Sequence, residues 1–151
     1  MKKQLRYQRI GKQLEELLKK SKSLQARMAT INALLYHKMD GFFWVGFYLL
    51  NDEKLQVGPY QGPLACLELP YDKGVCWASI KSGSSVIVSD VHAFPGHIAC
   101  DPRSKSEIVI PVKDSGNTII GVLDIDSNRL SNFDETDRYQ LEQIVSLMVR
   151  I

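Results

Sequence analysis

The sequence has few cysteines and no long apolar run, and both shortages narrow the classes of protein to consider. Its three cysteines include no C-x-x-C pair, so a zinc site built from closely spaced cysteines is poorly supported. The odd number argues against a complete framework of structural disulfides. No stretch approaches the roughly 20 apolar residues that a membrane-spanning helix needs. Charges interrupt the basic N-terminal segment, which therefore does not resemble a signal peptide.

Positive and negative charges are nearly balanced in the sequence. The chain has 19 Lys and Arg against 17 Asp and Glu, a formal net charge of +2. This balance predicts no strongly basic face, and we expect neither a nucleic-acid nor a membrane partner. We expect a cytoplasmic protein, in which the thiols are kept reduced. The 151 residues, 44% of them apolar, suffice for one domain over residues 1–151.

Both ends of the chain show the apolar spacing of helices. The first predicted stripe consists of Leu5, Ile10, Leu14, Leu17 and Leu18, and the second of Leu24, Met28, Ile31, Leu34 and Leu35. A helix within residues 132–151 has the apolar positions Leu141, Ile144, Val145 and Met148. Asp134 can cap this last helix with Ser131 or with Asp137. The helices of residues 1–40 include an amphipathic first one that could serve a homodimer interface as readily as the core.

Residues 42–130 predict strands and long loops. The aromatic and β-branched run at 42–50 favours a central strand, followed by a hairpin partner at 54–58. Residues 59–95 hold most of the glycine and proline and predict loops and short helical turns over a pocket, with one strand at 85–89. A second hairpin is expected at 107–112 and 118–125. The whole pattern is α+β, with an antiparallel sheet, helices on one face and pocket-forming loops on the other.

Cys100 is the best candidate for a nucleophile. Asp101 and Pro102 follow it like an N-cap and a first helical residue, and a helix N-terminus lowers the pKa of a thiol. The alternative is that Cys100 is a small buried apolar residue. Cys66 and Cys76 also lie in the loop-rich middle of the chain, so the three thiols can converge on one pocket.

Two histidines, His92 and His97, flank the same segment. They could supply a proton or orient a thiolate, or only form hydrogen bonds within their own loop.

Three acidic residues lie on the predicted second hairpin. Asp124 and Asp126 alternate on one strand and point to the same face, and Glu107 opens the partner strand. If the three meet, burial and repulsion raise at least one carboxyl pKa. A protonated carboxyl could then donate a proton while the others hold a cationic amine. The alternative is an exposed, solvated strand face.

The aromatic residues Trp44, Tyr48, Tyr60 and Trp77 suit a core as well as a ligand pocket. Only Tyr60, in the segment GPYQG that we interpret as a flexible loop, is expected to line a site from its position alone.

Several separated strings together resemble the free methionine-(R)-sulfoxide reductases, a family of single GAF domains. They are WVGFYLL, VGPYQGPLAC, GVC, DVHAFPGHIACD, SEIVIP and GVLDID, over about residues 44–133. The resemblance implies a six-stranded antiparallel sheet between helices, with a closed pocket above it. It implies reduction of the R epimer of free methionine sulfoxide, regeneration by thioredoxin, and no cofactor or metal.

The resemblance also implies roles for individual residues. Cys100 matches the nucleophile that becomes a sulfenic acid, Cys76 matches the favoured resolving thiol, and Cys66 is the alternative. Glu107, Asp124 and Asp126 match the acidic substrate-binding residues, and Trp44 matches a pocket tryptophan that packs on the S-methyl group.

The chain departs from the family at two positions. Trp77 replaces a glycine beside Cys76, which affects the expected mobility of that thiol. Arg103 replaces a small residue after Cys100 and either acts on Cys100 or the substrate, or is a solvated surface charge.

Two other functions fit the residues. A GAF sensor domain would bind a small molecule or report redox state through Cys100 without turnover, since one fold serves many functions. A metal-binding module could use Cys66, Cys76, Cys100 and His97, which are suitable ligands without a short chelating pair.

Overall fold

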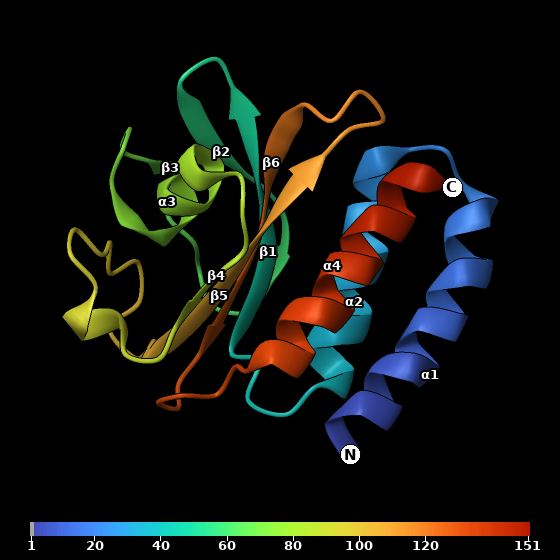
Figure 1. The fold of residues 1–151 in the computed structure, drawn as a ribbon, viewed down its shortest axis with the longest axis horizontal. Coiled ribbons are helices and arrows are strands. Elements are labelled where there is room, and N and C mark those ends of the chain that lie inside the picture. The colour runs from blue at the N-terminus through green and yellow to red at the C-terminus, as the bar shows by residue number, and fades with distance from the viewer. Residues whose placement is uncertain (1) are drawn as a thin grey trace.

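The computed structural model describes residues 2–151 as one antiparallel sheet with helices on both sides (Figure 1). The elements in chain order are α1 (Lys2–Leu17), a 3₁₀ turn (Leu18–Lys20), α2 (Leu24–Lys38), β1 (Trp44–Asn51), β2 (Lys54–Gln61), β3 (Glu68–Leu69), α3 (Gly74–Ser82), β4 (Val86–Val88), a 3₁₀ turn (Val91–Ala93), β5 (Ser106–Lys113), β6 (Ile119–Ser127) and α4 (Glu135–Arg150). None of the helices among these residues has the length and apolar character needed to cross a bilayer.

The six strands follow the order β3-β2-β1-β6-β5-β4, and every neighbouring pair is antiparallel. The two predicted hairpins are β1–β2 and β5–β6, and the pairing of β1 with β6 joins them into one sheet. The predicted α+β fold, with β1 near the centre of the sheet, is therefore confirmed.

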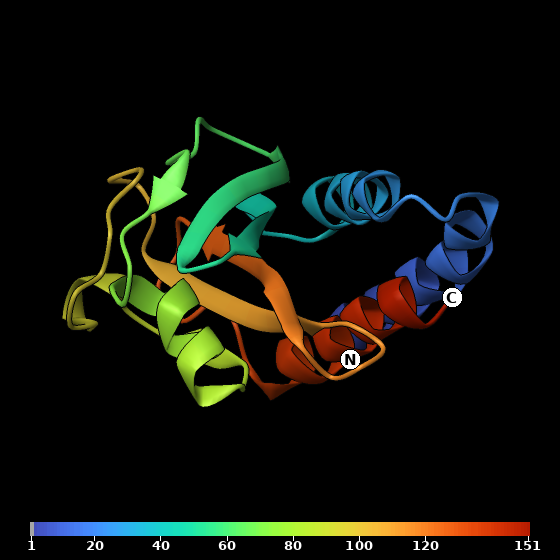
Figure 2. The same ribbon diagram turned by 90° about the horizontal axis from the view of Figure 1, so that it is seen from above.

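The sheet separates two hydrophobic clusters. Helices α2 and α4 cover one face, with α1 packed on the side of these two helices that is away from the sheet, and α3 lies with the long loops on the other face (Figures 1 and 2). Alternation along β1 explains the division, because Val45 and Phe47 face the three helices whereas Trp44 and Tyr48 face α3. We call these groups the helix-side cluster and the cavity-side cluster. The face that carries Trp44 and Tyr48 also carries the candidate site.

The stripe predicted for α1 is partly wrong. Leu5 is 48% exposed, whereas Tyr7, outside the predicted stripe, is buried with Ile10. The Tyr7 hydroxyl donates a hydrogen bond of 2.6 Å to buried Asp137, and the Lys3 ammonium lies 2.7 Å from the same carboxylate. The hydrogen bond to Asp137 therefore holds the Tyr7 side chain on the buried face of α1.

Asp137 also completes the N-terminal cap of α4. Its carboxylate accepts a hydrogen bond from the Asp134 backbone N–H, and the Asp134 side chain accepts one from the Asp137 backbone N–H. The predicted pairing of Asp134 with Asp137 is confirmed as a reciprocal capping box.

The expectation of loops and short helical turns over residues 59–95 missed the helix α3 and the two-residue strand β3. The helix α3 has 9 residues and ends at Gly83, whose φ of 68° is accommodated without strain by glycine. Its consecutive residues Val75, Cys76 and Trp77 are all buried. A short helix buried on several sides lacks the polar stripe by which a surface helix is found in a sequence.

Candidate active site

A cavity lies between the sheet and α3. Strands β1, β5 and β6 form its floor, and residues of α3 and of the loops around Leu64 and Ile98 complete its walls. Its free volume of about 40 Å³ exceeds the roughly 10–15 Å³ that one water requires.

The three predicted acidic residues meet on this floor. Strand register places Asp126 of β6 between Glu107 of β5 and Trp44 of β1. The side chains of Glu107, Asp126 and Trp44 therefore form one row across the sheet. Asp124 is two residues along β6 on the same face. Glu107 and Asp124 are only 5% and 6% exposed, so the alternative of a solvated strand face is wrong.

Gly46 leaves the room that Trp44 occupies. A Cβ atom at Gly46 would overlap the Trp44 ring and meet the Cβ of Tyr60. Without that atom, the Trp44 ring lies over the strand, stacked at 5.3 Å on Tyr60 and at 5.8 Å on Tyr48. The close approach explains a glycine inside a central strand.

The position of Tyr60 differs from the expectation. It belongs to strand β2, not to a flexible loop, and packs behind Trp44. Of the residues that the structure describes, Trp44 lines the cavity and Tyr60 does not.

Within the described part of the chain, the acidic residues lack a Lys or Arg partner that would neutralise them. Burial raises the pKa of Glu107 well above its usual value, and the carboxylates of Asp124 and Asp126 raise it further. Burial likewise raises the pKa values of Asp124 and Asp126. Within residues 2–151 no Lys or Arg forms an ion pair with these three acids. The floor is therefore suited to receive a cation from outside.

His97 is the one basic side chain beside this floor that forms an ion-pair contact among the described residues. Its Nε2 lies 3.8 Å from a Glu107 carboxylate oxygen. Burial, and then His92, lower the pKa of His97. A neutral imidazole can exchange a proton with the cavity but does not neutralise Glu107 at neutral pH.

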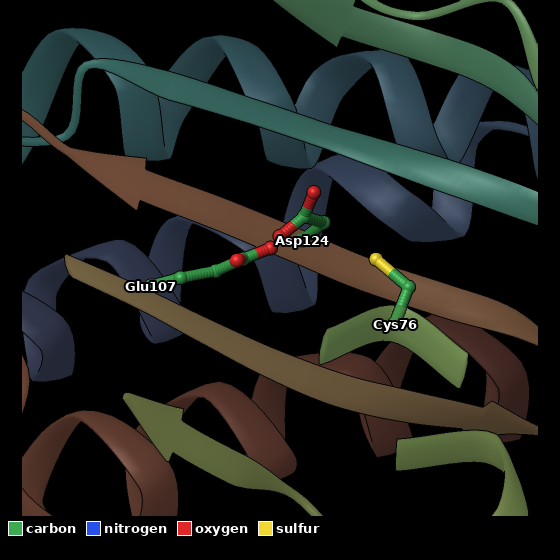
Figure 3. Close-up of side chains that lie close together, drawn as sticks. All are labelled: Cys76, Glu107 and Asp124. Atoms are coloured by element: carbon green, nitrogen blue, oxygen red, sulfur yellow. The ribbon is translucent and has the colours of Figure 1, made fainter. Parts of the chain in front are cut away.

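Two of the three cysteines form a disulfide at the cavity. Cys66 is bonded to exposed Cys100, with their Cα atoms 5.5 Å apart, and Cys100 lines the cavity. Cys76 carries a free, buried thiol on α3 that faces Glu107 and Asp124 (Figure 3). The structure thus pairs Cys100 with Cys66, the alternative, and not with Cys76. Burial, followed by the negative charges of Asp124 and Glu107, raises the pKa of the Cys76 thiol.

The helix expected after Cys100 is absent from the described chain. Asp101 begins a turn instead, because its carboxylate accepts hydrogen bonds from the backbone N–H of Arg103 at 2.9 Å and from the Arg103 guanidinium at 2.8 and 3.0 Å. These bonds hold the pKa of Asp101 at about 2. The Asp-Pro pair that can begin a helix also suits such a turn.

The two departures from the family pattern have structural explanations. Trp77 packs into the cavity-side cluster and meets the Tyr71 ring edge-on at 4.9 Å, so it anchors α3 and does not line the cavity. Arg103 lies over the Phe43 ring, with its guanidinium carbon 4.9 Å from the ring centre, while it pairs with Asp101.

Tyr48 is a cavity residue, although the sequence pattern alone suits a core position equally well. It lines the cavity, and its hydroxyl donates a hydrogen bond of 3.0 Å to the Cys66 carbonyl. The alternation of Trp44, Gly46 and Tyr48 along β1 could have revealed it, because these positions share the face of the acidic residues.

Comparisons with known proteins agree with this geometry. The GAF domain family profile matches residues 22–151. GAF domain-containing protein A of Dictyostelium discoideum is 45% identical over 147 residues, which cover 97% of this chain and 92% of the relative. The free methionine-R-sulfoxide reductase of Escherichia coli is 40% identical over 145 residues, with coverages of 96% and 87%.

The fold is also similar to that of a solved structure of a free methionine-R-sulfoxide reductase. The free methionine-R-sulfoxide reductase of Neisseria meningitidis in complex with its substrate superposes with a TM-score of 0.90 at 40% identity. The match covers 95% of this chain and 86% of that one.

Proposed function

Because the chain belongs to the GAF domain family, and within it to the free methionine-R-sulfoxide reductases, we propose that it reduces free L-methionine (R)-S-oxide to L-methionine. The observation that carries the proposal is the disulfide of Cys66 and Cys100 at a cavity floored by three acidic residues. A redox-active thiol pair and a site for a cationic amine are thereby combined in one cavity.

The acidic floor accounts for the choice of a free amino acid. The ammonium group of free methionine sulfoxide is a cation that Glu107, Asp124 and Asp126 would bind, and burial strengthens such contacts. In a peptide the same nitrogen is an uncharged amide and gains little from these carboxylates. We propose that Trp44, stacked over Tyr60 beside this floor, packs on the S-methyl group.

The chemistry requires one attack and one proton. The Cys100 thiolate attacks the sulfoxide sulfur and an acidic group protonates the sulfoxide oxygen. The bond of this oxygen to the methionine sulfur then breaks as the oxygen bonds to the Cys100 sulfur, so that methionine leaves and Cys100 becomes a sulfenic acid. One of the three carboxyls is suited to supply the proton, because burial and their mutual repulsion favour the protonated form of at least one of them while the others hold the ammonium. A second thiol then displaces water from the sulfenic acid to give a disulfide.

We assign the resolving role to Cys66. Its disulfide with Cys100 supports this assignment, as does the burial of Cys76, whose raised pKa leaves little reactive thiolate. The family resemblance had favoured Cys76, with Cys66 as the alternative.

The reductant that we propose is thioredoxin. A protein dithiol must bring its attacking sulfur to the bond between Cys66 and Cys100. Leu64 and Leu67, near Cys66 in sequence, are 86% and 73% exposed. Apolar side chains so exposed beside a reactive disulfide suit a protein partner. A cytoplasmic location and a homodimer both stay predictions. The apolar face of α1 packs within the chain, so it does not itself supply a surface for the homodimer.

The test is reduction of the separated R and S epimers of free methionine sulfoxide, with thioredoxin, thioredoxin reductase and NADPH. We expect turnover of the R epimer alone, none with Cys100→Ser, and one methionine per chain with Cys66→Ser. Mass spectrometry should find the bond of Cys66 to Cys100 in Cys76→Ser protein. Failure to consume either epimer would refute the proposal and favour the non-catalytic sensor.

A further inference from the structure

The thiol of Cys76 has no part in the proposed reaction, yet it lies among two carboxylates. Its Sγ and one carboxylate oxygen each from Glu107 and Asp124 all lie within 4.8 Å of one another. The three side chains come from α3, β5 and β6. Figure 3 shows that the Cys76 sulfur and the Glu107 carboxylate both point toward Asp124. Residues far apart in the sequence thus place three potential metal ligands together.

A second observation concerns Asp124 alone. Its Oδ1 is completely buried and accepts no hydrogen bond from residues 2–151, although the side chain lines the cavity. A buried carboxylate oxygen without a donor is costly. An occupant of the cavity that coordinates this oxygen would remove that cost.

We propose that Cys76, Glu107 and Asp124 form a binding site for a zinc ion. Zinc accepts one thiolate and two carboxylates in a tetrahedral arrangement and can keep a water as its fourth ligand. With metal–ligand bonds of about 2.0–2.3 Å, neighbouring ligand atoms lie roughly 3.3–3.8 Å apart. Since no two of these atoms are more than 4.8 Å apart, each separation needs to shorten by at most about 1.5 Å. The cavity volume of about 40 Å³ accommodates the ion and its water.

Zinc at this position would exclude the substrate. The site uses Glu107 and Asp124, the acidic residues assigned to the substrate ammonium, so one cavity cannot hold both cations. Zinc is then a competitive inhibitor with respect to methionine sulfoxide, a consequence that rests on the proposed function. Metal binding itself does not depend on that function.

The binding experiment uses the oxidised protein, in which the bond of Cys66 to Cys100 leaves Cys76 as the sole free thiol. Zinc affinity is measured by competition with a chromophoric chelator, and cobalt is added separately to look for the near-ultraviolet absorption of a thiolate–cobalt bond. We expect stoichiometric binding, a cobalt–thiolate band, and a loss of at least tenfold in zinc affinity in both Cys76→Ser and Asp124→Asn.

The matched control is His92→Gln, which removes an exposed potential ligand and should leave zinc affinity unchanged. Circular dichroism of each variant checks that it is folded. Equal zinc affinity in wild type and in a folded Cys76→Ser protein, or cobalt binding without the thiolate band, would overturn the proposal. These readouts need no turnover, so an inactive protein that binds zinc as expected would refute the reaction alone.

Discussion

Replacing Glu107 by Gln should separate activity from stability. The substitution keeps the size of the side chain but removes one of three carboxyl groups from a floor where no Lys or Arg of residues 2–151 is paired with them. Binding of the substrate ammonium should weaken, whereas the folded protein should lose a source of repulsion. The two effects have opposite signs.

The magnitudes follow from the burial. A hydrogen bond to a charged group contributes about 1.5–3 kcal/mol, so kcat/KM for methionine (R)-S-oxide should fall roughly 10- to 150-fold. Relief of repulsion on the order of 1 kcal/mol would raise Tm by about 2–4 °C in a chain of this size. The loss of activity should include a higher KM, because the ammonium is already bound in the ground state.

The assay is steady-state kinetics with each epimer, together with thermal unfolding of the same preparations. Glu53→Gln is the matched control, because Glu53 is exposed and should change neither quantity. An activity within twofold of wild type, or a Tm lowered by more than about 5 °C as for a damaged core, would refute this account of the acidic floor.

Three further predictions concern other parts of the molecule. Leu67→Ser should raise KM for thioredoxin roughly 5- to 30-fold while turnover driven by dithiothreitol stays unchanged; an equal loss with both reductants would contradict a docking role for this exposed side chain. Tyr7→Phe tests pH dependence, because burial first, then Asp137, raises the Tyr7 pKa well above 10. The Tyr7 hydroxyl therefore contributes its full stabilisation below pH 10. Above pH 10 the free energy of unfolding of wild type should fall by about 1.4 kcal/mol more per pH unit than that of the variant; if denaturant unfolding gives the same pH dependence for both proteins, this reasoning is refuted. Gly46→Ala should lower stability by about 1–3 kcal/mol and raise KM for the sulfoxide, since a Cβ atom there overlaps the Trp44 ring; unchanged KM and Tm would show that the ring has other room.

Features with a regular period could be predicted from the sequence. The alternation of Asp124 and Asp126 placed both on one face, and register with Glu107 then followed from the hairpin. The helical spacing at the two ends of the chain predicted α1, α2 and α4, although the burial of Tyr7 depends on Asp137, which is remote in sequence.

The remaining features depend on tertiary contacts. Cys66 pairs with Cys100 across 34 positions, and no local pattern distinguishes this bond from one to Cys76. The helix α3 was missed because Val75, Cys76 and Trp77 are all buried. The helix expected after Cys100 was wrong because Arg103 competes for the Asp101 carboxylate and forms a turn.

The sheet separates two hydrophobic clusters, and this separation affects how the sequences of such domains can vary. The helix-side cluster holds more of the buried apolar residues than the cavity-side cluster, whereas the residues that line the cavity project from the opposite face. Changes of ligand-contacting residues can therefore accumulate without unfolding the chain. A lineage could exchange one bound molecule for another while the layer of α1, α2 and α4 remains intact.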